Sequence, residues 1–570
     1  MILKYQKYLV MMILFLANSL LSITFGFFHK YWYAYIFILA LTSLLNSFSA
    51  IILIFKKIFS NKTSDNLKFL LNSTNYIYVI PCYNESEQEL INTINSLVLQ
   101  KKHKNDKNCI IIVCDGKAVG SGNLLSTDQI LLKKIFENKC IPNKLKYTTW
   151  DNRENTLEVY NGEYAFKNNT MKYILLIKNI NYGKRDSLVL IRKLCYNYNI
   201  NIDNDIMLSY DLFHNIKYQL DAIFGGTIKY IIGVDADTIL DYNCSNELIF
   251  SIEKDPNIHG CVGYVDVNVQ SHPTDLFILY QYGEYMYEQC LKRNAQSQIT
   301  HKVNCLSGCN QILRISEETC GNAILTRFYY LPKDTDNLFI HIRSVASEDR
   351  NHVCLMLSMY PYVKTIQNLN AIAYTNVPTT LRTFLSQRRR WSLGANLNDL
   401  MMLFMPNIHI FERIAAFINI TIYSLTPFIY IATIFFLISL FTNPSYLMLL
   451  LSIIMIIPYI YGLLIPIYIK PMIIRKVVYY YFSLIFFILV GSTFNLTTYF
   501  YSLAGMDNIK WGKTRTNANS VIILPEDDFW YDTSDLGIVE KTHTNTNTNT
   551  DKNTDTYITI INNNTIEYIV

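Results

Sequence analysis

Residues 230–238 read Tyr-Ile-Ile-Gly-Val-Asp-Ala-Asp-Thr, an apolar run that ends in two carboxylates, Asp235 and Asp237. A short apolar run bounded by polar residues is typical of a buried strand. Acids at the end of a buried strand are costly unless a cation or hydrogen-bond donors meet them. Carboxylate oxygens suit Mg²⁺ or Mn²⁺, which would bridge to a diphosphate. We interpret the pair as a metal site, with an ordinary helix-capping loop as the alternative.

Three more apolar runs precede this one, and each is followed by polar or glycine-bearing residues. They are Tyr76–Ile80, Ile110–Val113 and Met171–Ile177. Buried strands separated by helical patterns predict an α/β domain with a mostly parallel sheet. Ligands of such sheets bind at the carboxyl ends of the strands. The residues after the four runs are therefore candidates for one common site.

The residues after the first three runs have the chemistry of a nucleotide site. They are Pro81-Cys82-Tyr83-Asn84-Glu85, then Cys114-Asp115-Gly116 with Gly120-Ser121-Gly122-Asn123, then Gly183-Lys184-Arg185-Asp186. A carboxylate such as Asp115 can bind a base or ribose, and a cation such as Lys184 can meet a diphosphate. Taken singly, each also has an ordinary explanation: a capped helix, an Asp-Gly turn and a solvated charge cluster. The spacing of a P-loop is absent.

Two later motifs add an acid and a basic cluster. Ser347-Glu348-Asp349-Arg350 opens a helical pattern, so Asp349 is either a general base or an ordinary acid of a first turn. Gln387-Arg388-Arg389-Arg390-Trp391 lies just before a membrane-like region. Its arginines are either a positive flank of the membrane or a clamp for a leaving diphosphate, and Trp391 can stack on a sugar ring.

The composition indicates a chain that is part membrane and part globular. Of its 570 residues 51% are hydrophobic and 17% are charged, with a mean hydropathy of +0.14. The net charge of +5 gives no indication of a nucleic-acid partner. All twelve cysteines lie between Cys82 and Cys354 without a C-x-x-C pair, so we expect reduced thiols rather than disulfides or a zinc site.

Long apolar stretches flank the α/β region and are long enough to cross a bilayer as helices. They are Tyr8–Phe28, Tyr31–Phe55, Phe411–Phe441, Tyr446–Ile469 and Val477–Leu503. Lysines precede the first stretch and follow the second, so the positive-inside rule puts the N-terminus and the α/β region in the cytosol.

These patterns predict five segments along the chain. We expect two transmembrane helices in residues 1–56, a cytosolic catalytic domain in 75–408, further transmembrane helices in 409–504, a C-terminal segment in 505–540 and a disordered Thr/Asn-rich tail in 541–570.

The order and spacing of these motifs resemble those of chitin synthases, members of glycosyltransferase family 2. The resemblance runs from Pro81 to Trp391 and includes PCYNE, VCDG with GSGN, GKRDS, VDADT, QYGEY, NCLSGCNQILRI, SEDR and QRRRW. WGKTR at Trp511–Arg515 is similar to a C-terminal motif of the family. The family usually has proline in the CLPGC loop where this chain has Ser307, which puts the gating role of that loop in doubt.

The resemblance implies a GT-A-type α/β domain between transmembrane helices and a set of roles for individual residues. The uridine-diphosphate site would be lined by Pro81, Tyr83, Glu85, Asp115 and Lys184. Asp237 would bind Mg²⁺ or Mn²⁺ with Asp235 nearby, and Asp349 would deprotonate the acceptor's 4-hydroxyl. The diphosphate and the growing chain would be held by Gln387, Arg390 and Trp391, and Cys309 would lie in a loop near the acceptor.

By the same resemblance, the chain would transfer N-acetylglucosamine from UDP-N-acetylglucosamine to a growing β-1,4-linked chitin chain and export it. We expect a multi-pass protein of the plasma membrane in contact with lipids, and the sequence leaves room for a homo-oligomer. The alternatives are another processive synthase of the hyaluronan or cellulose type, and a transporter or receptor with a soluble insert. Three C-terminal spans would place Trp511–Arg515 outside the cell, whereas its neighbouring cations favour the cytosol, so one stretch is expected to be interfacial or split.

Overall fold

A computed structural model of the protein describes residues 2–28, 35–59, 74–103, 105–120, 123–138, 140–203, 205–269 and 272–507. The expectations for the tail 541–570, for Trp511–Arg515 and for nearly all of the segment 505–540 lie outside these residues. So do Ser121 and Gly122 of the GSGN motif.

A single ten-stranded sheet organises the α/β part of the chain. Its strands, in spatial order, are β3 (Asn143–Thr148), β4 (Glu154–Phe166), β5 (Asn169–Lys178), β2 (Lys107–Cys114), β1 (Asn75–Cys82), β6 (Tyr230–Gly233), β9 (Gln311–Arg314), β8 (Ile258–Val267), β10 (Lys364–Thr375) and β7 (Thr238–Leu240). The four expected strands are β1, β2, β5 and β6. They are neighbours in the sheet and run parallel, so their carboxyl ends share one edge.

The central strands are buried on both faces, which explains their continuous apolar runs. Ile77 and Val79 of β1 pack with α5 (Lys184–Ile200) and α6 (Tyr210–Phe224). The alternate residues Tyr76, Tyr78 and Ile80 pack with α3 (Glu87–Val98) and α7 (Cys244–Glu253) on the other face. Antiparallel pairs of β3, β4 and β5 on one side, and of β6, β9 and β8 on the other, extend the parallel centre.

Shorter helices connect the strands and carry several of the motifs. They are α4 (Thr127–Ile130), α8 (Leu276–Glu288), α9 (Glu317–Cys320), α10 (Asn322–Phe328), α11 (Leu338–Val345) and α12 (Glu348–Met359), with π-helical turns η3 (Leu131–Ile135), η4 (Gln289–Arg293) and η5 (Gln296–Thr300).

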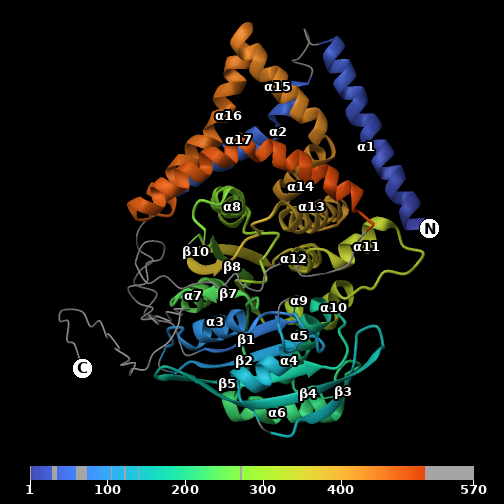
Figure 1. Ribbon diagram of the computed structural model, residues 1–570, viewed down its shortest axis with the longest axis vertical. Coiled ribbons are helices and arrows are strands. Elements are labelled where there is room, and N and C mark those ends of the chain that lie inside the picture. Colours follow the sequence, from blue (N-terminus) through green and yellow to red (C-terminus); the bar gives the residue numbers. More distant parts are fainter. Residues whose placement is uncertain are drawn as a thin grey trace, which may run out of the picture.

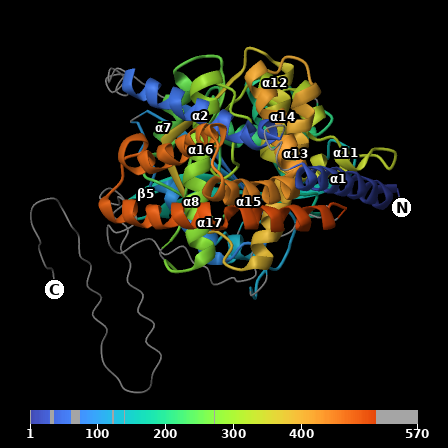
Figure 2. The ribbon, with the colours of Figure 1, turned by 90° about the horizontal axis from the view of Figure 1, so that it is seen from above.

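The apolar helices gather at the end of the molecule opposite the sheet's β3–β5 side (Figure 1). They are α1 (Ile2–Phe27), α2 (Ile36–Phe59), α14 (Ile410–Ser424), α15 (Thr426–Thr442), α16 (Tyr446–Leu464) with η6 (Ile465–Ile469), and α17 (Ile474–Ala504). Between them and the sheet lies α13 (Leu381–Phe404). Seen from above, α17 crosses α8, and α2 packs beside α16 (Figure 2). Among the described residues, four helices are long and apolar enough to cross a membrane.

Of the C-terminal apolar stretches, one of which is expected to be interfacial or split, Phe411–Phe441 forms a broken pair of helices. Helices α14 and α15 meet at an angle of 82° and satisfy the criteria for a span only together. The break has an identifiable cause, because Pro427 in the first turn of α15 lacks an N–H. Asn18 of α1 bonds the backbone on both sides of the break, donating to the Ser424 carbonyl at 2.9 Å and accepting from the Phe428 N–H at 3.0 Å. A side chain from a neighbouring helix thus satisfies backbone groups that the bend would leave open.

Helix α8 approaches α17 so closely that only glycine fits at Gly283. A Cβ there would lie 2.6 Å from the Ser483 carbonyl oxygen. We predict that Gly283→Val lowers the thermal stability of the purified protein by about 1–3 kcal/mol, the usual range for overpacking. Gly226→Ala is the control, because a Cβ there would meet no described atom within 4 Å. Equal melting temperatures for the two variants would contradict the close approach.

Candidate functional site

One cavity of about 1300 Å³ is lined by every residue to which the family resemblance assigns a role. Its lining includes Pro81, Tyr83, Glu85, Asp115, Lys184, Asp235, Asp237, Cys309, Asp349, Gln387, Arg390 and Trp391. These residues come from the ends of the strands β1, β2 and β6, from the loop that contains Cys309, and from the helices α5, α12 and α13. The shared edge of β1, β2, β5 and β6 explains the first of these groups. The roles suggested for the individual side chains remain predictions.

At one end of the cavity, two carboxylates follow neighbouring strands. Glu85 follows β1, and its Oε2 accepts the backbone N–H groups of Tyr83 at 2.7 Å and Asn84 at 3.0 Å, which fixes the loop. Asp115 follows β2 and is 3% exposed. Its Oδ1 accepts bonds from Lys178 and from the Tyr182 N–H. Its Oδ2 is buried and accepts no hydrogen bond from any described residue.

The cation of the GKRDS motif lies between carboxylates from two other motifs. Lys184 is the first residue of α5, and Gly183 before it has a φ of 92°, a conformation that glycine adopts without strain. The Lys184 Nζ lies 2.7 Å from Asp235 Oδ1 and 3.3 Å from Glu348 Oε1. Lys184 therefore joins the GKRDS motif to the VDADT and SEDR motifs.

Asp235 and Asp237 occupy the turn between β6 and β7. Thr93 of α3 donates to the Ala236 carbonyl between them at 3.1 Å, which holds the turn in place. In the described part of the chain no three or more His, Cys, Asp or Glu side chains are grouped as a metal site would require. Asp235 and Asp237 would supply two carboxylates here, a number that fits a cation completed by phosphate oxygens and water.

Asp349 lies in the first turn of α12, where its two oxygens have different surroundings. Oδ2 accepts the Gly308 N–H at 2.8 Å, whereas Oδ1 is buried and bonded to no described group. Gly308 belongs to the Cys305–Cys309 loop, and a Cβ there would lie 2.9 Å from Asp349 Oδ1, so the loop and the acid fit together only with glycine.

Burial raises the pKa of Asp349 to about 7, and the neighbouring Glu348 and Asp235 add to the effect. The pKa of Glu348 is lowered, because Lys184, Arg185 and Arg390 outweigh its own burial. The pKa values of these two adjacent acids are therefore shifted in opposite directions. Glu348 is ionised, and Asp349 can exchange a proton near neutral pH. This is the property expected of a general base.

The QRRRW motif lies within α13, and the helical period decides which of its residues reach the cavity. Gln387, Arg388, Arg390 and Trp391 line the cavity. Arg389 instead lies over the Tyr501 ring of α17, 5.7 Å from its centre. The motif therefore joins the cavity to a membrane helix.

The Arg388 side chain organises a group that sequence reasoning did not assign to the site. It forms an ion pair with Glu284 of α8, and its guanidinium lies 4.5 Å from the centre of the Trp391 ring. Tyr285 lies beside Trp391, with ring centres 6.1 Å apart. Glu284 and Tyr285 belong to the QYGEY motif, which is the one signal that could have found them.

Comparisons with known proteins identify the family. The family model described as "Chitin synthase" matches residues 50–539. Chitin synthase 8 of Gibberella zeae is 34% identical over 448 residues, which cover 77% of this chain and 66% of that protein. Chitin synthase 8 of Verticillium dahliae is 32% identical over 479 residues, covering 77% and 76%. The chain thus spans about two thirds to three quarters of these relatives.

Among solved structures, the mannosyltransferase PcManGT from Pyrobaculum calidifontis, in complex with GDP-Man and Mn²⁺, has a TM-score of 0.39 and 11% identity, covering 79% of this chain and 97% of that one. Residues 1–349 of TarS from S. aureus have a TM-score of 0.29 and 11% identity, covering 77% and 93%.

We predict that Asp349→Asn lowers the rate of sugar transfer by about 10²–10⁴-fold, the usual loss when a general base is removed. Only ionised Asp349 can accept a proton. With a pKa near 7, the wild-type rate should fall as the pH drops below 7 and level off above it. Pre-steady-state transfer rates across pH 5.5–8.5 check both points. Near-normal turnover by the variant, or a profile with no inflection near 7, would contradict the assignment.

Proposed function

Because this chain belongs to the chitin synthase family, we propose that it transfers N-acetylglucosamine from UDP-N-acetylglucosamine to the growing end of a β-1,4-linked chitin chain. The observation that carries the proposal is the single cavity. It joins the nucleotide-site candidates, the raised-pKa acid and the QRRRW helix, and it continues between helices α14, α15 and α17 past polar side chains such as Thr433 and Thr493. A hyaluronan- or cellulose-type synthase is not favoured by the relatives.

In the proposed reaction, the acceptor's 4-hydroxyl oxygen attacks C1 of the donor sugar on the face opposite the leaving group. Asp349 takes the hydroxyl proton as the new C1–O bond forms. The bond between C1 and the diphosphate oxygen breaks, and its electron pair leaves with uridine diphosphate. Attack from the opposite face inverts the configuration and gives a β linkage. Lys184 and Arg390 lie where they can hold the leaving diphosphate.

Asp237, with Asp235 nearby, is our candidate for holding Mg²⁺ or Mn²⁺ beside the diphosphate. A bound divalent cation would supply charge neutralisation for the leaving group. The two carboxylates and their position on the cavity wall suit this role.

Replacing the metal-site candidate gives a direct check. Asp237→Ala should abolish transfer and remove the Mn²⁺ dependence of UDP binding, measured by calorimetry with and without the ion. Asp241→Ala serves as the comparison, because Asp241 lies just after β7 but does not line the cavity. Full metal dependence in the Asp237 variant would place the ligand elsewhere.

Trp391 is our candidate for a platform under the acceptor sugar. Trp391 is 39% exposed and lines the cavity. The Arg388 guanidinium lies over its ring, and the Tyr285 ring lies beside it. If the ring only anchored the helix at the membrane interface, Trp391→Phe would be nearly silent. We predict instead a clear fall in polymer yield for Trp391→Phe and loss of elongation for Trp391→Ala, with UDP binding retained in both. Full-length polymer from the alanine variant would contradict the platform.

The function itself is tested with purified protein and radiolabelled UDP-N-acetylglucosamine. Insoluble product that chitinase degrades and hyaluronidase and cellulase do not is the expected result. The Asp349→Asn variant controls for contaminating activity. Product resistant to chitinase, or incorporation of a different nucleotide sugar, would overturn the proposal.

We further propose that the chain lies in the plasma membrane with its α/β part in the cytosol. The lysines that flank the first two apolar helices support this orientation. Cys140 is exposed, whereas the other eleven cysteines are buried or partly buried. An impermeant maleimide should label Cys140 only after cells are permeabilised, and Cys140→Ser should abolish that signal. Labelling in intact cells would refute the orientation.

A further inference from the structure

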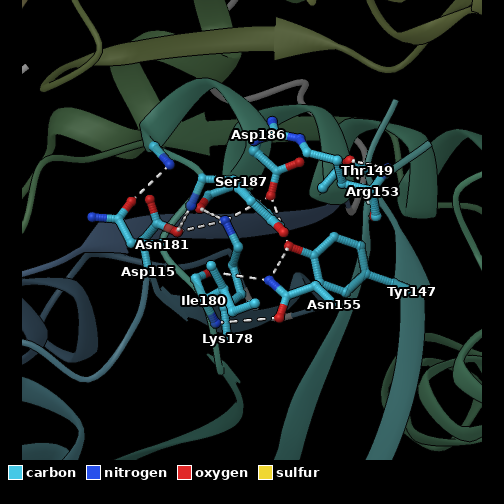
Figure 3. Close-up of polar contacts among 12 residues, drawn as sticks. Asp115, Tyr147, Thr149, Arg153, Asn155, Lys178, Ile180, Asn181, Asp186 and Ser187 are labelled. Carbon is cyan, nitrogen blue, oxygen red and sulfur yellow. Dashed lines mark hydrogen bonds and ion pairs between the residues drawn. The ribbon is translucent and has the colours of Figure 1, made fainter. Parts of the chain in front are cut away.

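A wholly buried lysine lies directly behind the nucleotide-site candidate Asp115. Lys178 is the last residue of β5 and is 0% exposed. Its Nζ lies 2.5 Å from Asp115 Oδ1, 2.6 Å from Asp186 Oδ2 and 3.2 Å from the Ser187 hydroxyl (Figure 3). Three acceptors match the three donors of an ammonium group, so its donors are fully used.

The second acid of this group is equally enclosed. Asp186 is 0% exposed and lies in the first turn of α5, two residues after Lys184. It accepts the Tyr147 hydroxyl at 2.8 Å and the Tyr329 hydroxyl at 3.2 Å. Asn155 in turn donates to the Tyr147 hydroxyl at 3.1 Å. Both oxygens of Asp186 are therefore satisfied inside the protein, and its role is internal.

Asp115 differs from Asp186 in one respect. Asp115 lines the cavity, its Oδ1 is held by Lys178 and the Tyr182 N–H, and its Oδ2 is buried and accepts no bond from the described residues. A buried carboxylate oxygen without a donor is costly, and an N–H or O–H of a ligand would relieve that cost.

We propose that Lys178 is a positioning residue for nucleotide recognition: it clamps Asp115 so that Oδ2 presents a fixed, ionised acceptor to a base N–H or ribose hydroxyl of the nucleotide sugar. This inference rests on the proposed function, which places the nucleotide at Asp115. Through Asp186, the same ammonium also ties this acceptor to the start of α5, where Lys184 pairs with Asp235. The nucleoside end and the diphosphate end of the site are thus fixed to one buried cation.

Loss of the cation has a predictable consequence for Asp115. Burial raises the pKa of Asp115 and the charge of Asp186 adds to the rise, whereas Lys178 is the main group that opposes it. Without Lys178, the carboxyl group would hold its proton to higher pH and would be free to rotate. A protonated Asp115 donates through one oxygen and no longer offers the same acceptor to the ligand.

The test uses UDP binding and steady-state kinetics of the full-length protein in detergent. Lys178→Met should weaken UDP binding and raise the KM for the nucleotide sugar by at least about tenfold, with a smaller change in kcat. The binding ratio of variant to wild type should recover as the pH is raised from 6 to 9, because Asp115 then ionises without its partner. A ratio that stays constant with pH would overturn the proposal.

Lys193→Met is the matched control. Lys193 is also buried, lies in α5 and pairs with Asp205 at 2.6 Å, but it does not line the cavity or touch Asp115. It should cost comparable thermal stability and leave the KM within about twofold of wild type. Equal effects of the two lysine variants on the KM would reduce Lys178 to a purely structural ion pair.

A double variant keeps the test decisive if Lys178→Met does not fold. Asp115→Asn with Lys178→Met restores the charge balance of the buried group, and its UDP affinity should match that of Asp115→Asn alone within about twofold. A further large loss in the double variant would show that Lys178 does not act through Asp115. If Asp115→Asn alone leaves UDP binding unchanged, the nucleotide site of the proposed function is misplaced. If it weakens binding while Lys178→Met does not, only the present inference fails.

Discussion

The parallel register of β5, β2, β1 and β6 is the constraint on which the rest of the molecule depends. It brings four chain segments that are distant in the sequence, those after Cys82, Cys114, Lys178 and Gly233, to one edge of the sheet. Each segment delivers a polar group there only because the strand before it is buried on both faces and cannot slip. A slip of one residue would exchange the two faces of β1, which pack against different helices.

This constraint also explains how much could be predicted. The four strands and their common edge follow from apolar runs that end in polar motifs, and Asp115, Lys184 and Asp235 follow from position at those ends. Asp349 and the QRRRW helix have no such local signature. An acid in a first turn and a basic cluster before a membrane segment are ordinary features, and the resemblance to a family, rather than periodicity, singled them out.

The sequence could not predict ion pairs and hydrogen bonds between residues that lie far apart in the chain or outside the recognised motifs. Lys178 ends a strand, where a lysine usually reaches solvent, and only the fold makes it a buried partner of two acids. Arg388 and Glu284 lie in different helices, and nothing in the QRRRW or QYGEY motif indicates that they form an ion pair. A split apolar stretch could be expected, but the side chain that stabilises the break between α14 and α15 could not, because Asn18 lies 410 residues away from Phe428.

Helix α13 contacts both the cavity and the apolar helix α17, and therefore couples the two. One face carries Gln387, Arg390 and Trp391 into the cavity, while Arg389 reaches the Tyr501 ring of α17. Gly394 on the same helix lies against Ser347, directly before the first turn that holds Asp349. A shift of α17 would therefore move Trp391 and the general-base candidate Asp349 together. Under the proposed function, in which the chain lengthens a polymer and passes it between helices, this coupling would keep the acceptor end aligned with Asp349 after each addition.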